Sequence, residues 1–263
     1  MKKIEIDELR ELQMQILDYV DAFCRTHDIK YTISGGTLLG AVRHGGFIPW
    51  DDDMDIQMLR SEYEKFTAIW NQNKEIHPYE FVSIESGNSM GYTFGKMHNP
   101  DTVTYLNGDE RTGVFIDIFP VDDVRDALDC KKRHEHIRKL YSRMMAAYAL
   151  EIDTKINFLR RVIYRIRSFG KTRLYYAEQI SRIAQNSNHK GYNMVFELVS
   201  GFKCKDPIYK YVFENMTDIH FENRVYMSVK DYDMYLTNTF GNYMTPPPPE
   251  KQKRDHSFVP YWK

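Results

Sequence analysis

The most chemically distinctive feature of this sequence is a run of four aspartates within five residues: Asp51, Asp52, Asp53 and Asp55. Side chains of an extended chain alternate between two faces, so Asp51, Asp53 and Asp55 would share one face. By the same parity Asp52 points away. Two carboxylates about 4 Å apart repel each other by about 4 kcal/mol at an effective dielectric constant of about 20. Such a cluster shifts its pKa values or binds a hard divalent cation, Mg²⁺ or Mn²⁺; a solvated acidic turn is the alternative.

A further aspartate, Asp117, stands in a strongly apolar stretch that runs from Gly113 to Pro120. An isolated buried carboxylate is costly unless it is paired or binds a metal ion. We therefore expect Asp117 to lie on a neighbouring strand beside Asp53 and Asp55, as the third carboxylate of a metal site. The alternative is an aspartate at the end of a strand that caps a turn.

A glycine turn precedes the aspartates by about 15 residues. The apolar residues 31–33 are followed by Ser34, Gly35 and Gly36 and then by a helix start at Thr37, which leaves free backbone N–H groups at the positive end of a helix. Such a point suits a phosphate group. Two adjacent glycines also serve any tight turn, so the signal gains its value from the nearby aspartates, because the two together indicate a phosphate held by a cation.

Four more side chains are candidates for contact with a donor phosphate. Arg43 and His44 lie at the end of the predicted glycine helix, where pairing with the helix dipole is the alternative role. Lys96 shares one face of a predicted strand with Phe94 and His98, so it could point at the same pocket; an exposed strand lysine is the alternative. His256 follows four prolines near the end of the sequence, where an ordinary surface histidine is the alternative. A zinc site is not expected, since no histidines and cysteines have ligand spacing.

The elements that would position these residues alternate between helices and strands. Apolar residues spaced by three and four predict a helix over residues 5–27. A strand over 31–33, a helix over 37–43, a strand over 51–58 and a helix capped by Ser61 and running to about Trp70 follow it. Alternating apolar and polar residues predict further strands of a mixed sheet at 79–84, 91–98, 102–106 and 113–119.

The second half of the chain has a different character. From 123 to about 185 the pattern is helical and basic, and residues 186–263 are mixed. Pro246 to Pro249 predict an extended polyproline segment. Residues 125–173 hold 14 Lys and Arg against 5 Asp and Glu, whereas the whole chain has a net charge of −1. That segment is therefore expected to meet anions.

Composition excludes several classes of protein. With 263 residues, 42% hydrophobic and 28% charged, the chain is globular and neither disordered, collagenous nor coiled-coil. Cys24, Cys130 and Cys204 are odd in number and widely spaced, which indicates buried thiols in a reducing cytoplasm rather than disulfides. A signal peptide and a run of 18 apolar residues are both missing, so neither secretion by that route nor a membrane span is expected.

Residues 155–171 combine an apolar stripe with a strongly basic remainder. A basic amphipathic helix of this kind can lie on an anionic membrane, and we keep peripheral contact with the inner face of the cell membrane as a hypothesis. The alternative is a helix that packs its apolar stripe into the core and leaves its basic face in solvent. Nucleic acid is not expected as a partner, because no reading motif accompanies the basic region.

The run from Ser34 to Ile56 resembles the LicD family of phosphocholine transferases, within the nucleotidyltransferase superfamily, whose animal relatives include fukutin and fukutin-related protein. The stretch 115–120 and the tail from Tyr235 to Met244, with Pro246 and His256, resemble later segments of that family. The resemblance is strong over residues 5–120 and weaker over 228–256. It does not extend to 125–225.

The resemblance implies an α+β fold, with a nucleotidyltransferase-like mixed β-sheet flanked by helices and a helical elaboration after residue 125. We expect a single domain over 1–263. Its parts would be a catalytic core over 1–124, a helical, basic elaboration over 125–225 and a C-terminal segment with the proline strap over 226–263.

The function implied by the resemblance is transfer of phosphocholine, or a related phospho-alcohol, from CDP-choline or a similar donor to a sugar hydroxyl, with release of CMP. The acceptor would be a cell-surface glycan such as teichoic acid, lipopolysaccharide or capsule, either free or lipid-linked during the reaction. Asp53, Asp55 and Asp117 would bind Mg²⁺ or Mn²⁺. Asp117 would also activate the acceptor hydroxyl, and Asp51 would bind a second metal ion or act as the base.

Two other functions remain open on the sequence alone. The chain could be a true nucleotidyltransferase that moves a nucleoside monophosphate from a nucleoside triphosphate and releases pyrophosphate. It could also be a non-catalytic, membrane-associated module that retained the fold.

Overall fold

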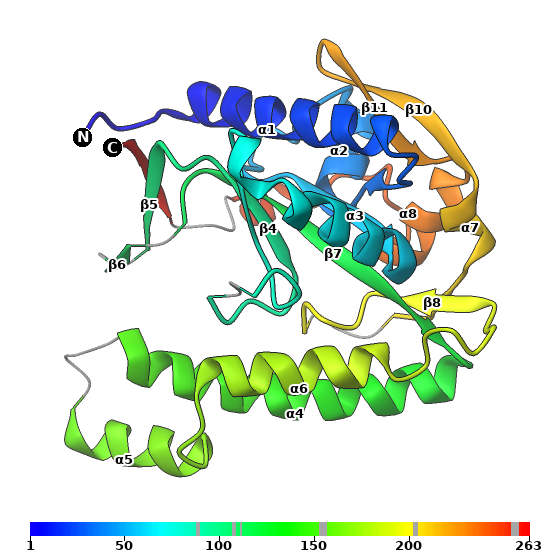
Figure 1. Ribbon diagram of the computed structural model, residues 1–263. Helices are drawn as coiled ribbons and strands as arrows, with labels where there is room; N and C mark the ends of the chain where they lie inside the picture. Colours follow the sequence, from blue (N-terminus) through cyan, green and yellow to red (C-terminus); the bar gives the residue numbers. More distant parts are fainter. Residues whose placement is uncertain (88–89, 107–108, 111, 153–156, 202–204, 254–257) are drawn as a thin grey trace.

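The computed structural model describes residues 1–87, 90–106, 109–110, 112–152, 157–201, 205–253 and 258–263. The fold is α+β, as predicted, with a mixed sheet flanked by helices (Figure 1). The predicted first helix is α1 (Ile6–Thr26), whose apolar stripe is buried. Because that stripe repeats at helical spacing, one side of α1 can pack on the sheet while the other stays polar.

The main sheet is built around the long strand β7 (Phe115–Val124). Its principal strands are ordered β1-β2-β7-β4-β3 and comprise β1 (Thr32–Ile33), β2 (Asp55–Leu59), β3 (Glu80–Val82) and β4 (Gly95–His98). Strands β2 and β7 are parallel, and the other neighbours in this order pair antiparallel. The end of β7 extends past this sheet and pairs with β8 (Met194–Phe196), which in turn pairs with β9 (Ile208–Tyr209).

The two faces of the sheet have different chemistry because side chains alternate along each strand. Ile56 and Met58 of β2, with Ile116 and Ile118 of β7, are fully buried in the larger core together with α1 and α3 (Arg60–Gln72). The intervening residues point to the opposite face. On that side, α4 (Ala127–Ile152) and α6 (Arg173–Gln185) form a second apolar cluster with the far end of β7 (Figure 1).

Several predicted boundaries are wrong. Helix α2 (Gly35–His44) begins at Gly35, so the glycines form its first turn instead of preceding it. Strand β2 begins at Asp55, so residues 51–54 are a non-strand approach to it. Helix α3 begins after Leu59, which leaves Ser61 inside the helix and not at its cap.

The predicted strand at 102–106 exists but belongs to another sheet. Strand β5 (Thr102–Leu106) pairs with β6 (Asp109–Glu110) and with the C-terminal strand β12 (Val259–Trp262), forming a separate three-stranded sheet. Sequence periodicity could indicate a strand here but not its partner, since the partner lies more than 150 residues away.

A helical region does follow residue 125, consisting of α4, α5 (Phe158–Arg167) and α6. The region 125–225 also contains the short helix α7 (Tyr211–Glu214), but it is not helical throughout, because β8, β9 and β10 (Met216–Phe221) fall within it. Strand β10 forms a hairpin with β11 (Arg224–Val229) that spans the predicted division at 225. The division of the chain into three parts stays a prediction.

The C-terminal part contains α8 (Tyr232–Phe240) and a 3₁₀ helix, η2 (Pro249–Lys251). Pro248 is extended, as a polyproline segment requires, but Pro249 already begins η2. The predicted polyproline segment is therefore shorter than its four prolines suggested. Among the described residues, no helix combines the length and the apolar composition that crossing a bilayer requires.

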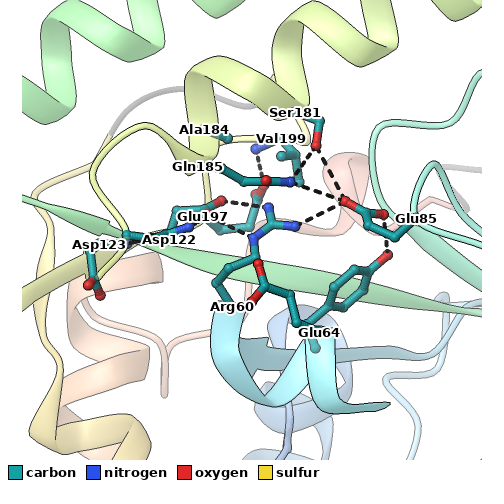
Figure 2. Close-up of polar contacts among 12 residues, drawn as sticks. Arg60, Glu64, Glu85, Asp122, Asp123, Ser181, Ala184, Gln185, Glu197 and Val199 are labelled. Carbon is teal, nitrogen blue, oxygen red and sulfur yellow. Dashed lines mark hydrogen bonds and ion pairs between the residues drawn. The ribbon is translucent and has the colours of Figure 1, made fainter. Parts of the chain in front are cut away.

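A buried polar cluster joins helices α3 and α6 to strand β7 of the sheet (Figure 2). Arg60 of α3 donates through Nε and Nη2 to both carboxylate oxygens of Asp122 on β7, at 2.8 and 2.9 Å. Its Nη1 donates to Glu85, which also accepts hydrogen bonds from Ser181 and Gln185 of α6. Arg60 and Asp122 are almost inaccessible to solvent. A buried ion pair is strongly destabilised when one partner is removed, because the other charge is left in a poor solvent.

We expect Arg60→Met to lower the free energy of unfolding by about 3–5 kcal/mol, because Asp122 would remain buried without its cation. The exposed Arg125, paired with Asp126 at the surface, provides a matched control. Arg125→Met should change the free energy by less than about 1 kcal/mol. Urea unfolding followed by circular dichroism measures both. Equal losses in the two variants would contradict a structural role for the buried pair.

Candidate functional site

A cavity of about 1060 Å³ lies against the face of the main sheet that carries the alternate side chains of β2 and β7. Asp55 and Gln57 of β2 and Asp117 and Phe119 of β7 line it. These residues are the alternation partners of the core residues Ile56, Met58, Ile116 and Ile118. The period-2 pattern therefore places an apolar face on the core and an acidic one on the cavity.

The strand register brings two of the predicted carboxylates together. Strand β2 pairs parallel with β7, with Asp55 opposite Asp117. The Asp117 N–H donates to the Met54 carbonyl at 3.0 Å, just before β2 begins. Two carboxylates from positions 62 residues apart therefore enter one cavity.

The electrostatics of Asp55 show how close the carboxylates are. Burial raises the pKa of Asp55 well above its ordinary value, and the neighbouring charges of Asp53, Asp117 and Asp51 raise it further, in that order. Lys96 acts in the opposite direction. Burial and the neighbouring aspartates both favour the protonated carboxyl, because an ionised group loses hydration on burial and is repelled by like charges. A cation bound beside Asp55 would remove this penalty.

Lys96 stands on the other side of Asp117. Strand β4 pairs antiparallel with β7, with Lys96 opposite Asp117, and the ammonium group forms an ion pair with the Asp117 carboxylate. Lys96 is 6% exposed, and its Nζ lies 3.6 Å from the centroid of the Phe115 ring. An aromatic face attracts a cation, so this ring helps to hold the ammonium group over the cavity face of the sheet.

Helix α1 holds the aspartate segment in place. Arg10 donates from Nη2 to the carbonyls of Ile48, Pro49 and Asp51, and Gln13 donates to the carbonyl of Asp52. Residues 51–54 keep an alternation although they precede the strand: Asp51 and Asp53 line the cavity, whereas Asp52 is buried and does not. The carboxylate of Asp52 nevertheless lies within 4.8 Å of those of Asp51 and Asp53, so the alternation does not turn Asp52 away from the other aspartates as predicted.

The first turn of α2 lies directly against the aspartates. The Ser34 N–H donates to the Asp55 carbonyl, and the Asp55 N–H donates to Thr37 Oγ1, both at 2.9 Å. A Cβ added to Gly36 would lie 2.4 Å from Oδ2 of Asp51, and one added to Gly35 would lie 3.2 Å from Oδ2 of Asp55. A side chain at position 36 would therefore displace the Asp51 carboxylate.

Comparison with known proteins matches the part of the chain that contains the cavity aspartates. The family model for LicD, fukutin and fukutin-related protein nucleotidyltransferase domains matches residues 28–148. The lipopolysaccharide cholinephosphotransferase LicD of Haemophilus influenzae is 32% identical over 97% of both chains. The chain belongs to the LicD family. The ribitol 5-phosphate transferase FKRP of Homo sapiens is 47% identical over 38 residues, which cover 14% of this chain and 8% of that protein.

The structure of this LicD chain brings most of the predicted site residues to one cavity. Seven of them line it: Ser34, Gly36, Asp51, Asp53, Asp55, Lys96 and Asp117. Gly35 and Thr37 lie beside it in the first turn of α2 without lining it. His256 lies outside the described residues.

Arg43 and His44 do not line the cavity. The Arg43 guanidinium donates through Nη1 to the carbonyl of Tyr243 at 2.7 Å, which ties α2 to the C-terminal segment. Burial lowers the pKa of both side chains, and the Arg43 charge lowers that of His44 further. Their predicted contact with a donor phosphate stays a prediction.

Sequence reasoning missed several residues of this LicD site. Tyr235 of α8 lines the cavity, accepts from the Gly35 N–H at 3.3 Å and donates to Gln57 at 3.0 Å. The Tyr235 hydroxyl therefore accepts from a backbone N–H that was predicted to bind phosphate. Arg173 and Glu197 also line the cavity, from a region without a recognisable motif. Only Tyr235 had a signal, because it begins the tail segment that resembles the family.

The donor set of this LicD site suits a hard cation. Carboxylate oxygens of Asp51, Asp52 and Asp53 lie within 4.8 Å of one another, and the charges of Asp53 and Asp51 raise the pKa of the half-buried Asp55. Oxygen donors of this type match Mg²⁺ and Mn²⁺. The ion pair of Asp117 with Lys96 supplies part of the positive charge that this cluster needs.

We expect the buried carboxyl of Asp55 to make wild-type stability pH-dependent in a buffer that contains a chelator. Its pKa is raised on folding, so the folded state binds more protons than the unfolded state between the two pKa values. The free energy of unfolding should then fall as pH rises from the ordinary aspartate range towards neutrality. Asp55→Asn should flatten this dependence and raise the free energy at pH 7 by at least about 1 kcal/mol.

Chemical denaturation across this pH range measures the effect. Asp101→Asn, at an exposed aspartate, is the matched control and should leave the wild-type slope unchanged. A slope that is the same in wild type and Asp55→Asn would contradict the raised pKa.

Proposed function

We propose that this LicD-family chain transfers phosphocholine, or a related phospho-alcohol, from a CDP-linked donor to a sugar hydroxyl of a cell-surface glycan and releases CMP. The observation that carries the proposal is the register that places Asp55 beside Asp117, facing a cavity also lined by Asp51, Asp53 and Lys96. Family membership supports a transferase. The nearly full-length relative is named for transfer of phosphocholine to lipopolysaccharide, and FKRP for transfer of ribitol 5-phosphate.

In the proposed reaction, the acceptor oxygen forms a bond to the donor phosphorus farther from the nucleoside. The bond from that phosphorus to the oxygen of CMP breaks, and the hydroxyl proton passes to a carboxylate. Asp117 is our candidate for this proton, and Asp51 is the alternative. Lys96 would hold a donor phosphate oxygen, since its ammonium group already lies over the cavity face beside Asp117. Positioning and charge stabilisation supply most of the catalysis in such transfers.

A divalent cation is part of the proposal. Asp53, Asp55 and Asp117 would hold Mg²⁺ or Mn²⁺, which supplies neutralisation of the donor diphosphate when bound. The raised pKa of Asp55 supports this assignment, because a nearby cation would offset the cost of burying this carboxylate among like charges. Asp51 could hold a second ion.

The location that we propose is the cytoplasm, at the inner face of the cell membrane, with a lipid-linked glycan as acceptor. Cys24 is free and buried, which suits a reducing compartment.

Asp55→Asn and Asp117→Asn should each lower kcat/KM for phosphocholine transfer by at least about a hundredfold, since each removes a carboxylate that would hold the cation, and Asp117 is also our candidate for the hydroxyl proton. Asp101→Asn is the matched control. Its side chain is exposed and does not line the cavity, so activity should stay within about threefold of wild type. The assay separates CMP from pyrophosphate by chromatography. Pyrophosphate as the nucleotide-derived product would identify a nucleotidyltransferase, and activity unaffected by the cavity aspartates would exclude this active site.

Thermal unfolding with candidate donors tests the substrate class directly. CDP-choline, CDP-ribitol or CDP-glycerol should raise the midpoint temperature only when Mg²⁺ or Mn²⁺ is present, because the ion offsets repulsion between diphosphate and carboxylates. Asp55→Asn should lose the donor-dependent rise. A rise with CTP and none with any CDP-alcohol would contradict the proposed donor.

A further inference from the structure

Helix α5 exposes its apolar side chains to solvent. No residue from Phe158 to Arg167 is buried, although the helix is well formed and begins at Asn157, whose side chain accepts from the Arg160 N–H. The alternative, in which this helix packs its apolar stripe into the core, is therefore wrong. A helix of this composition needs another surface to cover it.

The exposed side chains form one continuous stripe. At about 100° per residue they occupy less than half of the helix circumference. Phe158 is 82% exposed, Leu159 and Ile166 are each 69% exposed, and Ile163 is 50% exposed. Phe169, which follows the helix, is 67% exposed.

The side of α5 that faces the protein is the opposite one. Tyr164 is partly buried and Ser168, just past the helix end, is buried; helical spacing places both across the helix from the stripe. The Tyr176 hydroxyl of α6 donates to the Ser168 carbonyl at 2.7 Å, and Arg167 hydrogen-bonds to Ser142 of α4. Helix α5 is thus attached to α4 and α6 with its apolar stripe turned outward.

Basic residues flank this stripe along both edges. Their positions on the helix and just after it are Arg160, Arg161, Arg165, Arg167 and Lys171, and all five are exposed. From Asn157 to Ala177 the sequence contains no aspartate or glutamate. An apolar stripe between two cationic edges is complementary to a bilayer with anionic headgroups, because acyl chains accept the apolar groups and headgroups pair with the arginines.

The surface lies at the same end of the molecule as part of the cavity wall. Helix α5 connects the end of α4 to the start of α6 (Figure 1). Met145 and Tyr148 of α4 and Arg173 of α6, on those same ends, line the cavity. A membrane that binds α5 would therefore lie near the wall of the cavity that α4 and α6 form.

We propose that α5, with Phe169 and Lys171, is a membrane-binding surface that docks the protein on an anionic lipid bilayer. Its apolar stripe enters the interface between headgroups and acyl chains, and its arginines contact lipid phosphates. Binding is reversible and weakens with salt, because part of it is electrostatic. The docking does not depend on the transfer reaction, and its test uses no substrate.

Vesicle flotation tests the surface. The purified full-length protein should float with vesicles of phosphatidylcholine containing about 30 mol% phosphatidylglycerol in about 0.1 M salt, and much less with phosphatidylcholine alone. The triple variant Leu159→Glu, Ile163→Glu, Ile166→Glu should remain unbound. Arg160→Gln, Arg161→Gln, Arg165→Gln should bind the anionic vesicles roughly a hundredfold more weakly, from three lost headgroup contacts.

A control variant carries equivalent changes elsewhere. Lys74→Gln, Ile76→Glu replaces an exposed cation and a 77% exposed apolar residue in the 3₁₀ helix η1 (Lys74–Ile76), and should float like wild type. Circular dichroism and the midpoint temperature should be unchanged in every variant, because the altered side chains are exposed. Wild type that stays unbound, or a triple variant that floats like wild type, would overturn the proposal. So would size-exclusion chromatography showing that the stripe mediates self-association in wild type and not in the triple variant.

Discussion

The structure depends on the parallel pairing of β2 with β7, because this register forces two aspartates into one buried place. Asp55 and Asp117 lie side by side and face the cavity, while their neighbours Ile56 and Ile118 face the core. Exchanging the two faces of the strands would not relieve the repulsion, because the carboxylates would then be buried in the apolar core under α1 and α3. Lys96 on β4 offsets part of it, and the raised pKa of Asp55 shows that the offset is incomplete.

The surrounding elements can be understood as support for that pair. Helix α1 holds residues 51–54, which precede β2, through Arg10 and Gln13. The glycines in the first turn of α2 let its backbone approach the carboxylates closely. At the far end of β7, the buried pair of Arg60 with Asp122 fixes the same strand against α3. The long strand β7 therefore contributes to the acidic face of the cavity and also anchors α3.

The helical layer completes the cavity and also carries the exposed stripe of α5. Residues from α4, α6 and the segment around Glu197 line the cavity opposite the sheet. Burial raises the pKa of the Glu197 carboxyl, although hydrogen bonds from Ser200 counter this. The cavity is thus an acidic sheet face closed by a wall from a region that has no recognisable motif, and acceptor preference would arise from this wall.

The sequence by itself determined the local features: the amphipathic α1, the alternation by which Asp53 and Asp55 line the cavity and Asp52 does not, and the isolation of Asp117 in an apolar strand. These follow from periods of 3.6 and 2 residues, which short-range geometry imposes. The sequence also led us to expect Asp117 beside Asp55. Tertiary structure alone decided that Lys96 pairs with Asp117, that β5 joins β12, and that Tyr235 reaches the first turn of α2. Each of these joins residues far apart in the chain, and strand register or helix packing depends on the whole core, so no local pattern encodes it. The same reason left the exposure of α5 open, because a stripe of apolar residues does not indicate whether protein or solvent lies against it.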